Sequence, residues 1–251
     1  MVKLLLDQKA IDPNFPTSNG RTPLCRAVKC RHAGVVRLIL EHKDVNPNTS
    51  DGNGETPLWR AAGHKSDAIV QLLLDHKAID PNIPASSGST PLCRAAKHEN
   101  AEFVRLLLGR KVVDPNTTDG DGGTPLLWAV DHGNDTIVRL LLGHKAIDPN
   151  FPTSNGNTPL CRAAKRGNFK IARLLLERED VNPYTTDNDG GTPLWYAVGY
   201  KNDSIARLLL VHKAIDPNFP TSNGSTLLCK AAKRQNAEIV RLLLEREEPK
   251  Y

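Results

Sequence analysis

The chain has 251 residues, of which 39% are apolar and 24% are charged, so it has enough apolar surface to bury a core. Its aliphatic runs are only a few residues long, which excludes a membrane span, and its first apolar stretch ends at Asp7, which excludes a signal peptide. A net charge of +5 permits nucleic-acid binding without indicating it, and five cysteines, an odd number, argue against a secreted disulfide scaffold. We therefore expect a protein of the cell interior, in the cytoplasm or nucleus.

A 34-residue repeat runs through the chain. Each copy opens with the motif TPL, or TLL in the last copy. The motif begins at Thr22, Thr56, Thr90, Thr124, Thr158, Thr192 and Thr226, so no insertion or deletion separates the copies. Such fixed self-similarity predicts an array in which each repeat buries its apolar face against its neighbours. We expect one repeat domain over residues 1–251, with a partial leading repeat at 1–21 and a polar tail at 245–251. Residues 4–6 would then belong to a second helix without its first helix, so we expect the chain to be a piece of a longer protein.

The first element of each repeat is predicted to be a short helix. The Thr caps it through the side-chain hydroxyl, and the Pro that follows suits the first turn, where a missing N–H leaves no partner unpaired. We number positions from this Thr, so that Leu stands at +2 and small residues stand at +5 and +6. At about 100° per residue these three positions share one side of the helix, and the small residues should let neighbouring helices approach closely.

A second helix and a loop complete each repeat. The helix cap is predicted at +10, where the chain has Ser66, Asn100, Asn134, Asn168, Asn202 and Asn236, with His32 as the exception. Apolar residues at +13, +14, +16, +17 and +18 supply the buried face. The stretch after this helix, such as DPNFPTSNG at residues 148–156, has the composition of a turn.

The pattern G-x-T-P-L-x-x-A, a helical break, [IV]-V-x-L-L-L and an Asp/Asn-rich hairpin resembles the ankyrin repeat, over essentially the whole chain. The resemblance implies an all-α repeat solenoid, in which helix–turn–helix pairs stack side by side and short β-hairpin loops project from them. The Asp-Pro-Asn variant of the loop is similar to arrays common in filamentous-fungal proteins.

The chain departs from the ankyrin pattern at three positions. The family's His at +3 is replaced by Cys25, Trp59, Cys93, Leu127, Cys161, Trp195 and Cys229. The Gly between the helices remains only at Gly133 and Gly167. The Gly after the second helix is mostly Lys, at Lys9, Lys43, Lys77, Lys111, Lys145 and Lys213. A Lys at positive φ would cost roughly 1 kcal/mol, so we expect the turn there to differ from that of the family.

Neither the cysteines nor the histidines have the spacing of a metal or redox site. Packed helices lie about 8–10 Å apart, so cysteines two repeats apart should be about 20 Å from each other, whereas a disulfide needs Cα atoms within about 7 Å. We interpret the +3 cysteines as core residues and Cys30 as exposed. The histidine columns are interpreted as surface ladders at His64, His98 and His132, and at His42, His76, His144 and His212. Motifs for nucleotide binding and nucleophilic catalysis are absent, so we expect no enzyme activity, cofactor, metal or small-molecule substrate.

Charge and aromatic residues alternate on the first helices with a period of two repeats. We call the repeats that begin at 22, 90, 158 and 226 Cys-type, and those that begin at 56, 124 and 192 Trp-type. Positions +4 and +7 point away from the buried side, and in Cys-type repeats both are basic with no acid four residues away on the same helix. Basic residues on the second helices are partly answered by Glu41, Glu177 and Glu245, which is typical of a solvated face.

The ankyrin resemblance implies that first helices and hairpin tips line a concave groove that holds a partner. Carried over by position, the groove residues are Arg26, Lys29, Arg60, Arg94, Lys97, Trp128, Arg162, Lys165, Tyr196, Tyr200, Lys230 and Lys233. Arg, Tyr and Trp are enriched at interface hot spots. Duplication of a 68-residue block is the alternative origin of the alternation, since residues 12–27 and 148–163 differ only at Arg21 and Asn157.

These features favour a monomeric, non-catalytic scaffold for protein–protein interaction, whose partner presents an acidic surface. A surface for a polyanion, either nucleic acid or anionic lipid, is one alternative. The sensor part of a larger receptor or enzyme is another.

Overall fold

The computed structural model describes residues 11–212, 216, 218 and 224–245. Most of the predicted leading repeat (residues 1–10, with Lys9), Lys213 and residues 246–251 of the predicted tail lie outside the described residues.

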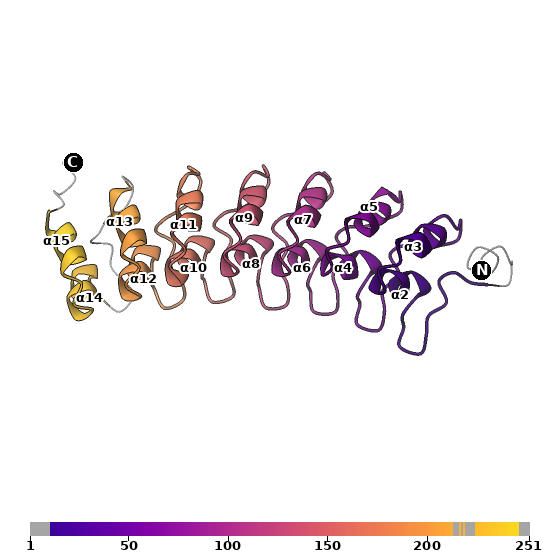
Figure 1. The fold of residues 1–251 in the computed structure, drawn as a ribbon. Helices are drawn as coiled ribbons and strands as arrows, with labels where there is room; N and C mark the ends of the chain where they lie inside the picture. Colours follow the sequence, from indigo (N-terminus) through magenta and orange to yellow (C-terminus); the bar gives the residue numbers. More distant parts are fainter. Residues whose placement is uncertain (1–10, 213–215, 217, 219–223, 246–251) are drawn as a thin grey trace. The chain divides into compact units, whose positions relative to one another are not determined.

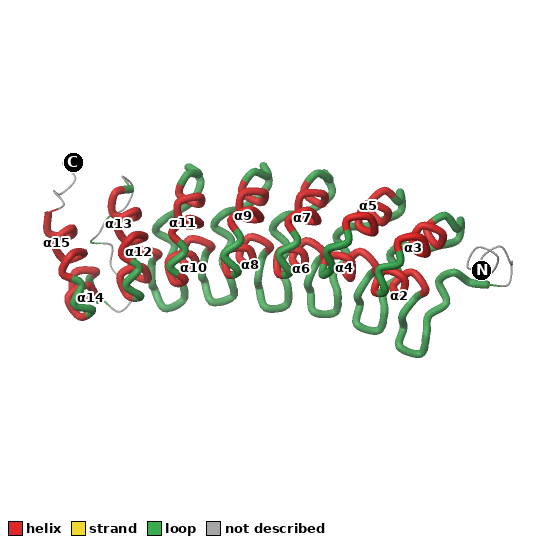
Figure 2. The backbone as a smooth tube through the Cα atoms, viewed as in Figure 1, coloured by secondary structure: helices red, strands yellow, loops and turns green. Residues whose placement is uncertain are grey.

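Each of the seven repeats contributes a pair of helices, and the loops between pairs project beyond the first helices (Figures 1 and 2). In the described ranges no residue is assigned to a strand, although hairpin closure bonds such as Thr17 N–H to Arg21 C=O are present. The helices are α2 (Pro23–Lys29), α3 (Ala33–Leu40), α4 (Pro57–Ala62), α5 (Asp67–Asp75), α6 (Pro91–Lys97), α7 (Ala101–Leu108), α8 (Pro125–Asp131), α9 (Asp135–Leu142), α10 (Pro159–Arg166), α11 (Phe169–Leu176), α12 (Pro193–Gly199), α13 (Asp203–Val211), α14 (Leu227–Lys233) and α15 (Ala237–Glu245).

The chain divides into two compact units, residues up to 128 with 143–146, and residues 129–142 with 147 onward. In the first unit α2, α4 and α6 pack in sequence, and α3, α5 and α7 form a second row. In the second unit α10, α12 and α14 form one row and α9, α11, α13 and α15 the other. Each unit is therefore a stack of helix–turn–helix repeats, which confirms the predicted fold class.

The predicted helix caps are present at every first helix. The Thr hydroxyl accepts a hydrogen bond from the N–H three residues on, as between Thr22 and Cys25 at 3.2 Å. At the second helices the prediction is confirmed for Asn100, Asn134, Asn168 and Asn236. It is wrong for Asn202, whose side-chain amide instead donates to the Ala164 carbonyl of the preceding repeat, and for Ser66, for which we have no physical account.

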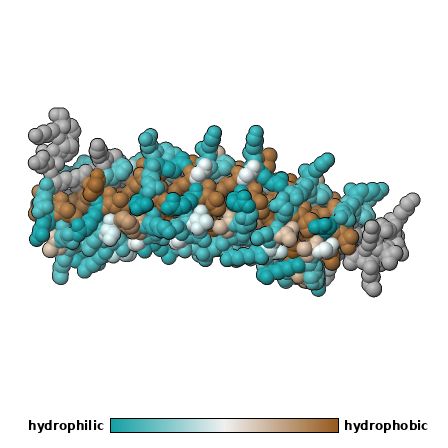
Figure 3. Space-filling view, turned by 45° about the horizontal axis from the view of Figure 1, so that its top comes forward, coloured by the Kyte–Doolittle hydropathy of each residue, from teal (hydrophilic) through white to brown (hydrophobic). Residues whose placement is uncertain are grey.

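The core is built from the positions that the repeat predicts. The small residues at +5 are at most 5% exposed in all seven repeats, so the backbones of neighbouring first helices come close together. Cysteine at +3 is fully buried in three repeats, but Cys229 is exposed. Its helix α14 packs mainly against α12 and α15. On the face seen in Figure 3, hydrophilic residues predominate and apolar residues lie between them.

The Asp-Pro-Asn stretch links each loop to the next. In the first repeat, Asp12 accepts a hydrogen bond from the Asn14 N–H at 2.8 Å, which fixes the turn. The Asn14 side chain then donates to the Asp44 carbonyl at 2.7 Å and accepts from the Asn46 N–H at 2.7 Å. Equivalent donor bonds from Asn48, Asn82, Asn116 and Asn150 repeat this link. The motif therefore satisfies backbone groups of the following loop as well as its own.

The non-glycine residues at positive φ lie between the two helices of a repeat, whereas the hairpin loops have glycine at positive φ, at Gly20, Gly54, Gly88, Gly122, Gly156, Gly190 and Gly224. Position +9 has positive φ in six repeats, with Gly133 and Gly167 at two of them and Arg31, Glu99, Lys201 and Gln235 at the others. Lys43, Lys77, Lys111 and Lys145 do not have positive φ, so they avoid the cost expected for a Lys in that conformation. An L-residue in the left-handed region costs about 1 kcal/mol, so four repeats carry backbone strain.

We predict that Lys201→Gly, at φ 59°, raises the free energy of unfolding by about 0.5–1 kcal/mol, because Gly relieves this strain. Lys65 stands at the same position of its repeat without positive φ, and Lys65→Gly should lower stability by a similar amount because it only adds chain entropy to the unfolded state. Urea denaturation of both variants checks this. A shift in the same direction for both would contradict the strain argument.

Candidate functional site

A carboxylate at the hairpin of each Trp-type repeat organises the surface of the first helices. The three residues are Asp51, Asp119 and Asp187, and each Oδ1 accepts hydrogen bonds from the N–H groups two and four residues on, at 2.8–3.1 Å. Each Oδ2 accepts from the side chain nine residues on, which is position +4 of the helix that follows. Cys-type loops have no Asp at this position, and Thr17 and Thr153 hold their turns through the hydroxyl instead.

The +4 side chains of Trp-type repeats are therefore committed to their own hairpins. Arg60 pairs with Asp51 and with Glu55, and it is only 8% exposed. The prediction that Arg60 lies on the exposed face is wrong, because two acids of its own loop draw the guanidinium inward. Trp128 donates its indole N–H to Asp119 at 2.8 Å, and Tyr196 donates its hydroxyl to Asp187. The acids of these loops can be recognised in the sequence. Their +4 partners cannot, because the two groups meet only when the hairpin folds back on its helix.

Burial and hydrogen bonding act in opposite directions on these carboxylates. Burial alone would raise the pKa of Asp187, but hydrogen bonds from Tyr196, the Gly191 N–H and Lys165 hold it below its usual value. Asp51 behaves in the same way, with burial opposed by Arg60 and by two backbone N–H groups, and its pKa is lowered. Burial and the Asp187 charge raise the pKa of Tyr196, so the phenol keeps its proton and remains a donor.

Basic side chains of Cys-type repeats lie over aromatic rings of the neighbouring Trp-type repeats. Position +4 reaches back to the preceding repeat: Arg94 lies over the Trp59 ring, 3.5 Å from its centroid, and Lys230 lies 3.7 Å from that of Trp195. Position +7 reaches forward: Lys97 lies 4.1 Å from the centroid of Trp128, and Lys165 lies 3.7 Å from that of Tyr196. Each contact is of the kind that stabilises by about 0.5–2 kcal/mol.

Glycine at +7 of the preceding repeat makes room for the backward contacts. A Cβ on Gly63 would stand 2.7 Å from Arg94 Nε, and one on Gly199 would stand 2.6 Å from Lys230 Cε. Where +3 is Leu127 rather than Trp, +7 is Asp131, which pairs with Arg162 at 3.0 Å and with Arg166 at 3.2 Å. The sequence carries this signal as TPLWRAAG and TPLWYAVG against TPLLWAVD. Comparing the copies within the chain would have found it.

The predicted groove residues thus fall into three groups. Arg60 is buried. The exposed ones are Arg26, Lys29, Lys97, Tyr200 and Lys233. Those of intermediate exposure are Arg94, Trp128, Arg162, Lys165, Tyr196 and Lys230. Among them Arg162 and Lys165 have acidic partners, whereas Arg94 and Lys97 have no ion pair with a described residue.

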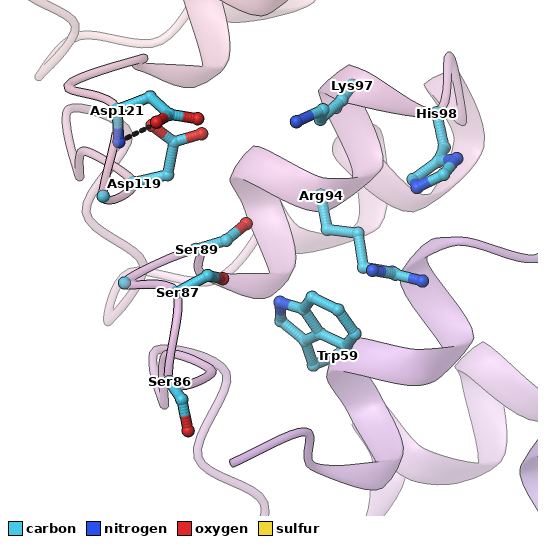
Figure 4. Close-up of a pocket in the computed structure, with 11 residues that line it drawn as sticks. Trp59, Ser86, Ser87, Ser89, Arg94, Lys97, His98, Asp119 and Asp121 are labelled. Atoms are coloured by element: carbon cyan, nitrogen blue, oxygen red, sulfur yellow. Dashed lines mark hydrogen bonds between the residues drawn. The ribbon is translucent and has the colours of Figure 1, made fainter. Parts of the chain in front are cut away.

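A cleft of about 700 Å³ lies in the first unit between α6 and the hairpins on either side of it (Figure 4). Trp59, Arg94 and Lys97 line one side, and the hairpin tips at 86–89 and 119–121 line the other. A backbone hydrogen bond of 2.7 Å from Gly120 N–H to the Ser87 carbonyl joins the two tips. Burial lowers the pKa of Arg94, and the charge of Glu55 opposes this effect.

The cysteines and histidines form no reactive cluster. Burial raises the pKa of the Cys25, Cys93 and Cys161 thiols, so they stay protonated and weakly nucleophilic at neutral pH. Cys30 is exposed, as predicted. In the described part of the chain, no three His, Cys, Asp or Glu side chains are grouped closely enough to hold a metal ion. None of the described helices has the length and apolar composition needed to cross a bilayer.

A family model for ankyrin repeats in three copies matches residues 34–119, 92–187, 141–221 and 179–250, and one for many copies matches residues 5–58. The chain belongs to the ankyrin repeat family. Ankyrin repeats generally mediate protein–protein interaction and are typically non-enzymatic modules.

Two solved structures are similar to this ankyrin repeat chain. The ankyrin repeat protein EF0377 is 27% identical, with a TM-score of 0.72 over 76% of this chain and 97% of its own. The ankyrin repeat domain of Bcl-3, a unique member of the IkappaB protein family, is 28% identical, with a TM-score of 0.73 over 82% and 90%. No curated protein sequence matches the chain.

We predict that Asp187→Asn lowers the free energy of unfolding at pH 7 by about 2–4 kcal/mol, because it leaves Lys165 and Tyr196 without their charged acceptor. Since the folded-state pKa of Asp187 is lowered, its stabilisation is complete above the unfolded value of about 3.9 and is lost as the pH falls through the folded value. The difference between wild type and variant should therefore shrink below about pH 4.

Urea denaturation between pH 7 and pH 2.5 measures this difference. Glu179→Gln removes an exposed carboxylate from the same unit and is the control. A difference that is the same at every pH would show that the lost contacts of Asp187 are not electrostatic.

Proposed function

We propose that this chain is a non-catalytic scaffold for protein–protein interaction, that it binds its partner along the first helices and hairpin tips, and that the partner contributes acidic side chains. The supporting observation is the state of Arg94 and Lys97. Both are held over aromatic rings beside the cleft, and neither has an acidic partner among the described residues. A cation that is positioned in advance loses little conformational freedom when it meets a carboxylate.

The polyanion alternative has less support. Four acids, Asp51, Asp119, Asp131 and Asp187, stand among the groove residues, and three of them pair with basic side chains of the same surface. A nucleic-acid strand needs a continuous basic track for its phosphates, whereas here the uncompensated cations are separated by neutralised ones. The surface suits a partner with a few acidic side chains at defined places.

Three finer features belong to the same proposal. We expect the chain to act as a monomer inside the cell, in a compartment where five free cysteines stay reduced. Three further statements stay predictions. They are that the Asp-Pro-Asn loops are like those of fungal arrays, that the chain is a single domain, and, as an alternative function, that it is the sensor part of a larger protein. Arg60 is better described as a residue that positions its hairpin than as a contact residue.

The test is charge reversal at the two cations that line the cleft and have no ion pair with a described residue. Arg94→Glu/Lys97→Glu should reduce capture of the partner from native cell extract by at least about tenfold, since each lost charge-assisted contact is worth about 1.5–3 kcal/mol. Arg37→Glu/Arg139→Glu is the control, because it changes the net charge equally at exposed positions of the second helices. Circular dichroism establishes that both variants remain folded.

Capture that survives Arg94→Glu/Lys97→Glu, or that falls equally in both variants, contradicts the groove assignment. Binding of random oligonucleotides with a steep dependence on salt would instead favour the polyanion reading. Arg162 and Lys165 are left unchanged in this experiment, because a Glu at either position would stand beside the Asp that now pairs with it.

A further inference from the structure

One side of the cleft beside α6 has hydrogen-bond donors without acceptors. Trp59 is 6% exposed, and its indole Nε1 is buried without a hydrogen-bond partner. Arg94 Nε is also buried without a partner, and the Arg94 side chain lines the cleft. Of the four arginines whose Nε is buried and unpartnered, only Arg94 has no ion pair with a described residue; the others are Arg21, Arg60 and Arg162.

The opposite side of the cleft is acidic. Figure 4 shows Asp119 and Asp121 on one hairpin tip, facing the cleft from the side opposite Arg94. Asp119 is occupied by Trp128 and by its own turn, whereas the Asp121 side chain is exposed. Ser87 and Ser89, on the neighbouring hairpin tip, line the same side of the cleft as these acids. The cleft therefore offers positive charge and N–H donors at one end and negative charge at the other.

The corresponding place 68 residues on lacks these features. Leu127 replaces Trp59, Asp131 replaces Gly63, and Arg162 is bound to that Asp at 3.0 Å. In one copy an acid of the chain thus pairs with the guanidinium of Arg162. In the other copy no described acid pairs with Arg94. The Arg162–Asp131 pair shows that an arginine at this position can bind a carboxylate, and Arg94 lines a cleft without such a partner among the described residues.

We propose that this cleft binds a peptide segment of the partner through an Asp or Glu side chain, with a Lys or Arg of the same segment close by. The carboxylate lies end-on against the outer nitrogens of Arg94 above the Trp59 ring, with Lys97 adjacent. The basic side chain meets Asp121. This inference rests on the proposed function and adds the recognition chemistry of one subsite. A phosphate group fits less well, because its second negative charge would face the acidic side.

The experiment selects from a random 12-residue peptide library displayed against the full chain. We expect the recovered peptides to share an acidic residue near a basic one. A synthetic peptide of the selected sequence is then measured against wild type and Arg94→Gln, with its acid intact or changed to the amide. Each single change should weaken binding at least about tenfold, and the two together should weaken it little further, because they remove the same contact.

Two variants keep the test independent of any folding defect. Gly63→Asp displaces Arg94 from its place over the Trp59 ring and offers it the acid that Arg162 has, so it should weaken peptide binding at least about tenfold while the chain stays folded. Arg139→Gln removes an exposed arginine of the second helix α9 and is the control, and it should leave peptide binding unchanged. The indole N–H resonance of Trp59, assigned by comparison with Trp59→Phe, should shift when the acidic peptide is added and stay in place with the amide peptide.

The subsite is overturned if the selection yields no peptide, if the peptides lack an acid, or if Arg94→Gln and Arg139→Gln weaken binding equally. It is also overturned if a phosphoserine form of the peptide, or an oligonucleotide, binds more tightly than the carboxylate form. The proposed function survives any of these results if Arg94→Glu/Lys97→Glu still abolishes partner capture. It fails separately if that capture is unchanged.

Discussion

The close packing of neighbouring first helices is the constraint on which the rest of this surface depends. Alanine at +5 is buried in every repeat, so no side chain separates the two backbones at this level. The residues next to it, at +3, +4 and +7, must then share a narrow strip with those of the adjacent repeat. Within this strip Arg94 and Lys97 lie over aromatic rings of the adjacent repeats, and Arg162 lies beside a carboxylate of the preceding repeat. Charge placement on the outer face thus follows from small residues on the inner one.

The sequence predicted the fold almost completely, because its signals are local and repeated seven times. Thr-Pro caps, the buried +2, +5 and +6 positions and the Asn caps at +10 each depend on neighbours within one repeat. The surface was predicted less well. Position alone places Arg60 outward, and only the return of its hairpin brings Asp51 and Glu55 to it. The basic residues of the first helices likewise have no acid four residues away on the same helix. Asp131 and Asp187, which pair with two of them, come from the neighbouring repeats. A helical wheel carries no information on contacts made across a repeat boundary.

The alternation of Cys-type and Trp-type repeats has a physical role, whatever its origin in duplication. Cys-type helices carry the cations, and they extend +4 backward and +7 forward. Trp-type repeats carry the rings and the hairpin acids that receive them. The pairing places Arg162 and Lys165 beside acids of the neighbouring repeats, whereas Arg94 and Lys97 have no ion pair with a described residue. The binding specificity of such a surface depends on which cations lack an acidic partner and not on the total charge.

The hairpin Asp has a further consequence for how the array can change in length. It occurs in every second loop, where it holds a turn, a +4 side chain and, at Asp187, a lysine from the repeat before. Loss of 34 residues would place two repeats of one kind side by side, either two rows of cations without rings or two acidic hairpins without lysines. Loss of 68 residues would restore the original neighbours at the new junction. The array therefore has a parity, and it can gain or lose repeats at low energetic cost only in pairs.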